Sequence, residues 1–94
     1  MQGEFDKPIR DAWAEADRFL AEYADKYKMS FGLSYSNIID WVADFTPRRN
    51  HPKAREYGLW QGTGGTREEA ILAALDLAIA ELIRFEITGK DDYR

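Results

Sequence analysis

Hydrophobic residues near the start of the chain recur at three- and four-residue spacing, which is the period of an amphipathic helix. The pattern predicts a helix over about residues 7–27, with Pro8 in its first turn, where a missing amide hydrogen costs nothing. Its apolar stripe consists of Ile9, Ala12, Trp13, Ala16, Leu20, Tyr23 and Tyr27. Charged side chains lie largely elsewhere on the helical wheel, so we expect one buried face and one exposed face.

The period then changes to two, which is typical of strands with one buried face. Phe31, Leu33 and Tyr35 alternate with glycine and serine and predict a strand over about 30–36. A second strand is predicted over about 39–46. The larger side chains on one of its sides are Ile39, Trp41, Ala43 and Phe45. A serine and an asparagine between the two strands supply turn chemistry, so the pair is predicted to form a hairpin.

A proline ends the second strand, and a third strand is expected over about 55–62 after an irregular connection. Tyr57 and Leu59 fall on one side of this strand and Trp60 on the other. Two interpretations of Trp60 stay open. If Tyr57 and Leu59 face the core, Trp60 points outward and joins Val42 in an exposed apolar spot; otherwise Trp60 is covered within the fold.

The clearest boundary follows a glycine-rich turn, where Thr66 and Glu69 match a capping box. The capping box predicts a helix over about 67–88, and Gly89 is a natural stop. The wide apolar face of this helix indicates a central, well-buried position. Residues 89–94 are expected to be a polar tail.

Together these elements predict a single α+β domain over residues 1–94, with two layers and the order helix, three-stranded antiparallel sheet, helix. The alternation in the second strand predicts that one sheet face meets the helices and the other meets solvent or a partner. Trp13, Trp41 and Phe45 are expected to belong to the core.

Composition narrows the class of protein. Of the 94 residues, 45% are hydrophobic, enough for one core, and none is cysteine, which excludes disulfides and thiolate metal sites. No apolar run approaches the roughly 18 residues that span a bilayer, and the amino terminus has no signal-like apolar stretch. We therefore expect a cytoplasmic protein with no membrane partner.

Charge identifies one unusual segment. The formal net charge is −4, which argues against the broad cationic surface of a general nucleic-acid binder. Residues 48–55, here called the basic loop, nevertheless contain four basic side chains and no acidic one. These are Arg48, Arg49, Lys53 and Arg55. The basic loop is therefore a candidate interaction surface for an acidic protein or for phosphates.

Residues that could support catalysis do not form a catalytic pattern. His51 is the single histidine and has cationic neighbours, so we expect a solvated loop residue. Asp40 and Asp44 are expected on the open sheet face about 13 Å apart, beyond the span of a glycosidase pair. The glycine-rich turn lacks the lysine of a P-loop. We predict no enzymatic activity, no cofactor and no metal site.

Three segments carry a resemblance to a known family: the helix DAWAEADRFLAEY at Asp11, the strand WVADF at Trp41 and the helix start TREEAILAAL at Thr66. From about Pro8 to Leu82 the chain resembles the phage ABA sandwich domain, a small domain of bacteriophage and prophage proteins. The resemblance implies a phage-encoded α+β protein in the host cytoplasm and supplies no catalytic residues.

The same order of elements, with GTGGTREEAILAAL leading into the last helix, also resembles the double-stranded RNA-binding domain. In that family the last helix begins with lysines that grip phosphates across a groove. The corresponding positions here are Arg67, Glu68 and Glu69. This resemblance therefore implies a shared topology rather than RNA binding by that route.

We expect a noncatalytic phage or prophage accessory protein that binds another protein, such as a host factor or defence component, through the open sheet face and the basic loop. The candidate contact residues are Arg48, Arg49, Lys53, Arg55, Trp60 and Val42. Nucleic-acid binding through the same loop is the alternative. The two sheet edges also make a homo-oligomer a plausible assembly.

Overall fold

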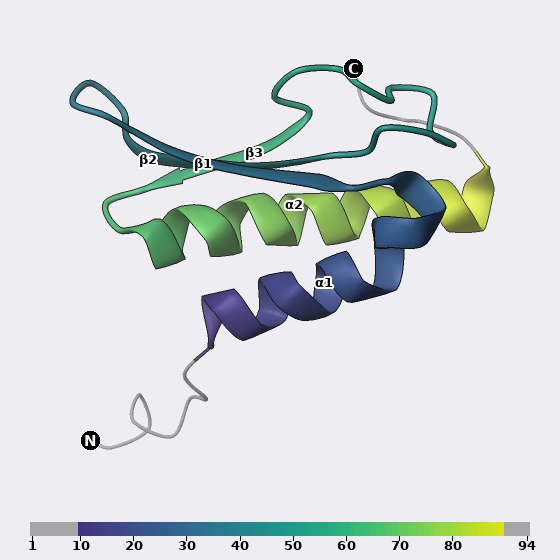
Figure 1. Ribbon diagram of the computed structural model, residues 1–94, viewed down its shortest axis with the longest axis horizontal. Coiled ribbons are helices and arrows are strands. Elements are labelled where there is room, and N and C mark those ends of the chain that lie inside the picture. Colours follow the sequence, from purple (N-terminus) through teal and green to yellow (C-terminus); the bar gives the residue numbers. More distant parts are fainter. Residues whose placement is uncertain (1–9, 90–94) are drawn as a thin grey trace.

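The computed structural model describes residues 10–89, arranged as a sheet with two helices against it (Figure 1). The elements are α1 (Ala12–Tyr27), β1 (Ser30–Ser36), β2 (Asp40–Thr46), β3 (Trp60–Gly64) and α2 (Arg67–Thr88). The strands form one antiparallel sheet in the order β1-β2-β3, and both helices lie on the same side of it. The predicted α+β fold is confirmed. Pro8, Ile9 and the predicted tail beyond Gly89 lie outside the described residues.

Helix α1 begins at Ala12, because Asp11 is its N-cap and accepts a hydrogen bond from the Ala14 amide at 3.1 Å. It ends where Lys28 adopts the left-handed conformation, with φ of 52°. The prediction that Trp13 belongs to the core is wrong: 42% of the residue is exposed, and its indole donates to Glu68 at 3.0 Å. Trp13 lies beside the buried stripe, and its polar ring atom is satisfied at the surface.

The β1–β2 hairpin has the predicted alternation. Its register pairs Phe31 with Phe45 and Tyr35 with Trp41, which places these side chains on the face that meets the helices. Phe45 is fully buried, and its ring centroid lies 5.1 Å from that of Phe19 in α1. Tyr35, by contrast, is 59% exposed, because it lies toward the turn end of the hairpin.

Strand β3 starts later than predicted, and its register decides between the two interpretations of Trp60. It begins at Trp60, whereas residues 56–59 form a turn in which Gly58 has φ of 70°. Pairing of Trp60 with Phe45 places the indole on the helix-facing side, and Trp60 is only 1% exposed. The interpretation in which Trp60 points outward beside Val42 is therefore wrong. The turn breaks the alternation, so the facing of Tyr57 does not determine that of Trp60.

Helix α2 is the central helix and packs beneath β2 and β3. Both hydrogen bonds of the capping box at Thr66 and Glu69 are present, and Gly89 closes the other end. A close approach to the sheet requires Gly62, since a Cβ there would collide with the α2 backbone at Ala73 and Ala74. Neither helix within residues 10–89 combines the length and apolarity needed to cross a membrane.

Candidate functional site

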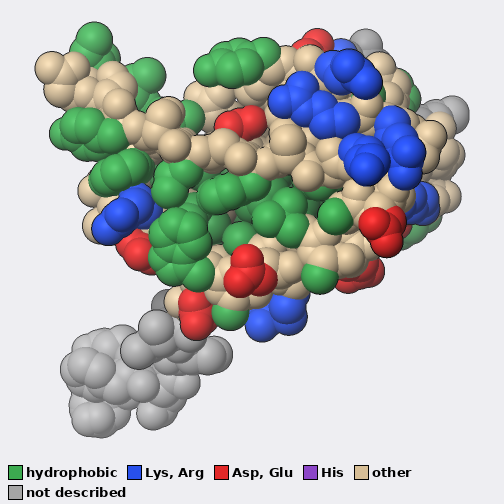
Figure 2. All heavy atoms as spheres, in the orientation of Figure 1, with side chains coloured by type: hydrophobic (Ala, Val, Ile, Leu, Met, Phe, Trp, Pro, Cys, Tyr) green, Lys and Arg blue, Asp and Glu red, His purple; other side chains and the backbone are tan. Residues whose placement is uncertain are grey.

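The segment that joins β2 to β3 carries most of the predicted site. Figure 2 shows lysine and arginine side chains gathered at the upper right, in the region where Figure 1 places this connection. The connection covers residues 47–59 and includes the basic loop. Its conformation decides which of the predicted cations lie close together.

The first part of the basic loop is fastened to the end of α1. The Arg48 and Arg49 amides both donate to the Tyr27 carbonyl, at 2.8 and 3.1 Å. The Arg49 side chain donates to the Asp25 carbonyl at 2.7 Å, and the Asn50 side chain binds the neighbouring carbonyl at 2.8 Å. These bonds satisfy carbonyls that the helix end leaves without partners, and the cation favours the negative end of the helix dipole. Arg49 therefore has a structural role.

The second part of the loop is a compact turn. The Arg55 amide donates to the Pro47 carbonyl at 2.8 Å, and the Ala54 amide donates to the His51 carbonyl at 3.0 Å. Arg55 has φ of 72°, which lies in the left-handed region. The Pro47 bond returns the chain to the end of β2, so Arg48 and Arg55 lie near each other.

His51 holds this turn against the core, and the prediction of a solvated loop residue is wrong. The ring is half-buried, with its centroid 4.6 Å from that of Phe85 and 5.3 Å from that of Trp60. Its Nδ1 accepts a hydrogen bond from the Lys53 amide at 3.0 Å. The aromatic neighbours come from β3 and α2, so no local pattern around His51 indicated them.

A pocket of about 400 Å³ lies between the basic loop and the outer face of the sheet; we call it the loop pocket. Its lining residues are Ser30, Phe31, Gly32, Asp44, Thr46, Arg48, Arg55 and Tyr57. Thr46 belongs to β2 and is nevertheless buried. Near the start of β1 and the end of β2, the basic loop thus partly covers the outer face of the sheet, which was expected to be open.

The floor of the loop pocket is organised around one carboxylate. The Thr46 hydroxyl donates to Oδ2 of Asp44 at 3.0 Å. Gly32 pairs with Asp44 across the strands, and a Cβ at Gly32 would collide with the carboxylate oxygen. Because Gly32 has no side chain, the Asp44 carboxylate can lie over β1 at this position.

The wall of the pocket supplies positive charge. Arg48 Nε donates to the Ser30 hydroxyl at 3.2 Å. In the described part of the chain, no carboxylate lies within salt-bridge distance of Arg48 or Arg55. With Asp44 as the single anion of the lining, the pocket has a net positive charge. Tyr57, at its edge, is 94% exposed.

The structure thus separates the predicted contact residues. Arg48 and Arg55 meet at the loop pocket, whereas the Arg49 side chain binds the end of α1. Val42 lies half-buried on the outer sheet face, beyond the pocket, and Trp60 lies on the opposite face. Lys53 is half-buried and does not line the pocket. Sequence reasoning did not identify Ser30, Gly32, Thr46 and Tyr57 as site residues, and it considered Asp44 only as a pair with Asp40 on the open sheet face. Its position three residues before Pro47, close to the end of β2, was the available signal.

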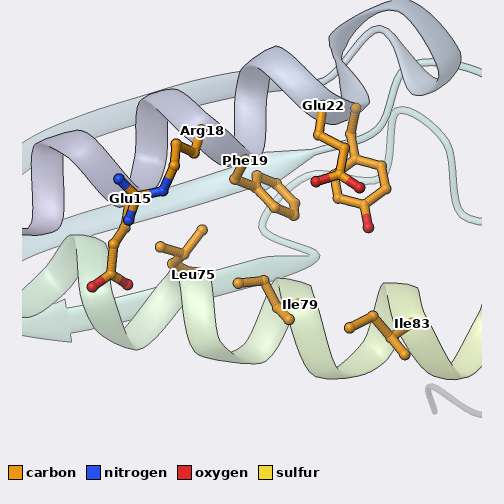
Figure 3. A pocket seen from close by; sticks show the side chains of 8 residues that line it. Glu15, Arg18, Phe19, Glu22, Leu75, Ile79 and Ile83 are labelled. Carbon is orange, nitrogen blue, oxygen red and sulfur yellow. The ribbon is translucent and has the colours of Figure 1, made fainter.

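A second recess, of about 420 Å³, runs between the two helices on the side away from the sheet (Figure 3). Apolar side chains from both helices form its floor: Phe19, Tyr23, Leu75, Ile79 and Ile83. Glu15, Arg18 and Glu22 stand along the α1 side. Arg10 already binds Glu15 and Asp76, and these hydrogen bonds lower the pKa of both carboxyl groups. This recess therefore offers mainly apolar contact, and Glu15 at its rim is already paired with Arg10.

Below the basic loop, the carboxyl ends of the two helices are joined by a small polar network. The Tyr27 hydroxyl and the Lys26 amine donate to the same Glu86 oxygen, at 2.9 and 2.8 Å. Burial, together with the Glu86 hydrogen bond, raises the pKa of Tyr27 to about 12. The Lys26 ammonium lowers the pKa of Glu86. Tyr27, whose carbonyl holds the start of the basic loop, is thus itself bonded to α2 through its hydroxyl.

Across residues 10–89, no group of three or more potential metal-binding side chains comes together. No protein-family model matches the chain, and neither a curated protein nor a solved structure shows detectable similarity to it.

Proposed function

We propose that the protein is a noncatalytic phage or prophage accessory protein that binds another protein through the basic loop and the outer face of its sheet. The observation that carries the proposal is the pair Arg48 and Arg55, which line one pocket without a carboxylate partner in the described chain. The phage or prophage origin rests on the resemblance to the phage ABA sandwich domain at Asp11, Trp41 and Thr66.

The chemistry of the loop pocket favours an acidic side chain of the partner. Guanidinium groups bind carboxylates through paired, charge-assisted hydrogen bonds. Asp44 adds an acceptor for a backbone amide or another donor next to that carboxylate. Tyr57 is exposed beside the arginines, and tyrosine and arginine are both enriched among residues that dominate binding energy. The segment of the partner that enters the pocket therefore carries an acidic side chain, with hydrogen-bond donors beside it.

The same geometry disfavours the alternative of nucleic-acid binding. Affinity for a phosphate backbone increases with the number of cations that reach it. Arg49 is committed to the end of α1, and Asp44 places a negative charge on the pocket floor. The lining of the loop pocket thus offers a phosphate backbone only Arg48 and Arg55, next to one carboxylate.

A comparison of three baits tests the proposal in lysate from a bacterial host. The wild type is compared with an Arg48→Gln/Arg55→Asn double variant and with Arg18→Gln, a control on the far side of the molecule. Asparagine suits position 55 because it tolerates the left-handed region. We expect proteins retained by the wild type and by Arg18→Gln to be lost from the double variant. Equal retention by all three baits would show that the loop pocket is not the contact surface.

Synthetic peptides then test the acidic-side-chain requirement. A peptide from a retained protein that contains the contacting Asp or Glu should bind, and its Asn or Gln counterpart should bind at least about tenfold more weakly, as expected for loss of a charge-assisted pair. A mobility-shift titration with duplex DNA and RNA covers the alternative. Tight binding whose affinity falls steeply with salt would favour nucleic acid instead.

A further inference from the structure

β1 is an edge strand without the usual protection. Within residues 10–89, β2 pairs with one side of β1 and no strand pairs with the other. Natural edge strands are commonly blunted by charged side chains, proline or a bulge. The sequence of β1, SFGLSYS, contains no charge and no proline, and its register with β2 is continuous from Ser30 to Ser36. This edge can therefore accept another strand.

The side chains of β1 are arranged symmetrically about Leu33. At equal distances on either side stand two serines, Ser30 and Ser36, then two aromatic residues, Phe31 and Tyr35. The positions next to Leu33 hold glycine and serine, both small. A strand with this pattern is complementary to itself when it runs antiparallel to a copy about a two-fold axis at Leu33. Aromatic then meets aromatic, and small meets small.

Exposure and charge also fit a second copy of the chain. On the helix-facing side of β1, Phe31 and Leu33 are half-buried and Tyr35 is 59% exposed, so apolar surface is left for a partner to cover. A two-fold axis brings like charges together, which is costly in a chain whose net charge is −4. The uncharged β1 avoids this cost. β3, the other edge, is shorter and contains Gly62 and Gly64.

We propose that β1 pairs antiparallel with β1 of a second copy, centred on Leu33, so that the two sheets become one continuous sheet. Leu33 faces Leu33 of the second copy across the axis, and each Phe31 faces a Tyr35. This pairing uses the main-chain edge and the helix-facing side chains of β1, whereas the partner proposed for the loop pocket meets the outer face of the sheet. Ser30, Phe31 and Gly32 of β1 also line that pocket.

Sedimentation of the wild-type protein and cysteine cross-linking test the pairing. The chain has no cysteine, so a single Leu33→Cys variant reports only contacts at the axis. Directly opposed residues on antiparallel strands have Cβ atoms about 4.5–5.5 Å apart, close enough for a disulfide after small adjustment. Thr63→Cys, an exposed position on β3, is the matched control for the other edge. We expect a wild-type dimer, and a disulfide-linked dimer from Leu33→Cys but not from Thr63→Cys.

A third variant does not depend on disulfide formation. Ser34→Lys puts a charge on an exposed position of β1, which should leave the fold intact and raise the dimer dissociation constant by roughly tenfold or more. Circular dichroism checks that the variant is folded. The proposal is overturned if the wild type sediments as a monomer, if cross-linking occurs at position 63 and not at 33, or if Ser34→Lys leaves dimerisation unchanged. Pairing of β1 with a foreign strand alone would also appear as a wild-type monomer.

Discussion

The backbone carbonyl of Tyr27 accepts hydrogen bonds from the amides of both Arg48 and Arg49, at 2.8 and 3.1 Å. The last residue of α1 is thereby tied to the first residues of the basic loop. Of the four cations in this loop, Arg49 completes the helix end, and Arg48 and Arg55 line the loop pocket. Stability and binding should therefore respond to different arginines.

Arg49→Ala should destabilise the fold although the residue is exposed. It removes the 2.7 Å bond to the Asp25 carbonyl and a cation at the negative end of the α1 dipole. We expect a loss of about 0.5–1.5 kcal/mol in the free energy of unfolding, measured by urea denaturation. Arg55→Asn is the control and should change stability by less than about 0.5 kcal/mol. A larger effect at Arg55 than at Arg49 would contradict the assigned roles.

Trp60 should behave as a core residue in solution. We expect Trp60→Ala to cost about 3–5 kcal/mol, since it removes a large side chain that is 1% exposed. In variants that keep a single tryptophan, iodide should quench Trp13 fluorescence strongly and Trp60 fluorescence weakly. Comparable quenching of the two would mean that Trp60 is on the surface.

Gly62→Ala should separate α2 from β3. The new Cβ would collide with the backbone at Ala73 and Ala74, which cannot move as a flexible side chain can. Overpacking of this kind costs about 1–3 kcal/mol and sometimes more, which thermal unfolding would detect. Gly65→Ala is the matched control: its Cβ would meet only a Glu69 side-chain oxygen at 3.4 Å. Equal tolerance of both substitutions would argue against the close helix–strand contact.

Stability should fall at alkaline pH through Tyr27. Its pKa is raised in the fold from the ordinary 10.0 to about 12, so the folded state holds the phenolic proton more tightly than the unfolded state does. This contribution is complete below about pH 10 and is lost as the pH rises toward about 12. Urea unfolding across that range should show a smaller decline for Tyr27→Phe than for the wild type. A decline that is equally steep in Tyr27→Phe and in the wild type would contradict this role of the Tyr27 hydroxyl.

Local pattern was sufficient for the elements whose signals are continuous. The capping box at Thr66 and the left-handed Gly89 mark the ends of α2, and both signals lie within a few residues of those ends. The alternation in β2 likewise indicated that Ala43 and Phe45 face the helices, because strand neighbours point to opposite faces. Such features depend on backbone geometry that a short segment carries by itself.

The loop pocket was predictable only in part. The run of cations identified the basic loop, yet charge alone could not distinguish Arg49, which caps α1, from Arg48 and Arg55, which line the pocket. The difference depends on bonds to carbonyls more than twenty positions earlier in the chain. His51 was misjudged for the same reason, because its ring contacts come from distant elements.

The sequence by itself determined the order of helices and strands, the helix-facing side of β1 and β2, and the segment that concentrates positive charge. Only the tertiary structure decided the facing of Trp60 and which cations share a pocket. The physical reason is the range of the interactions: helix and strand periods are local, whereas the turn before β3 resets the alternation. Long-range pairing with Phe45 then selects the face on which Trp60 is buried.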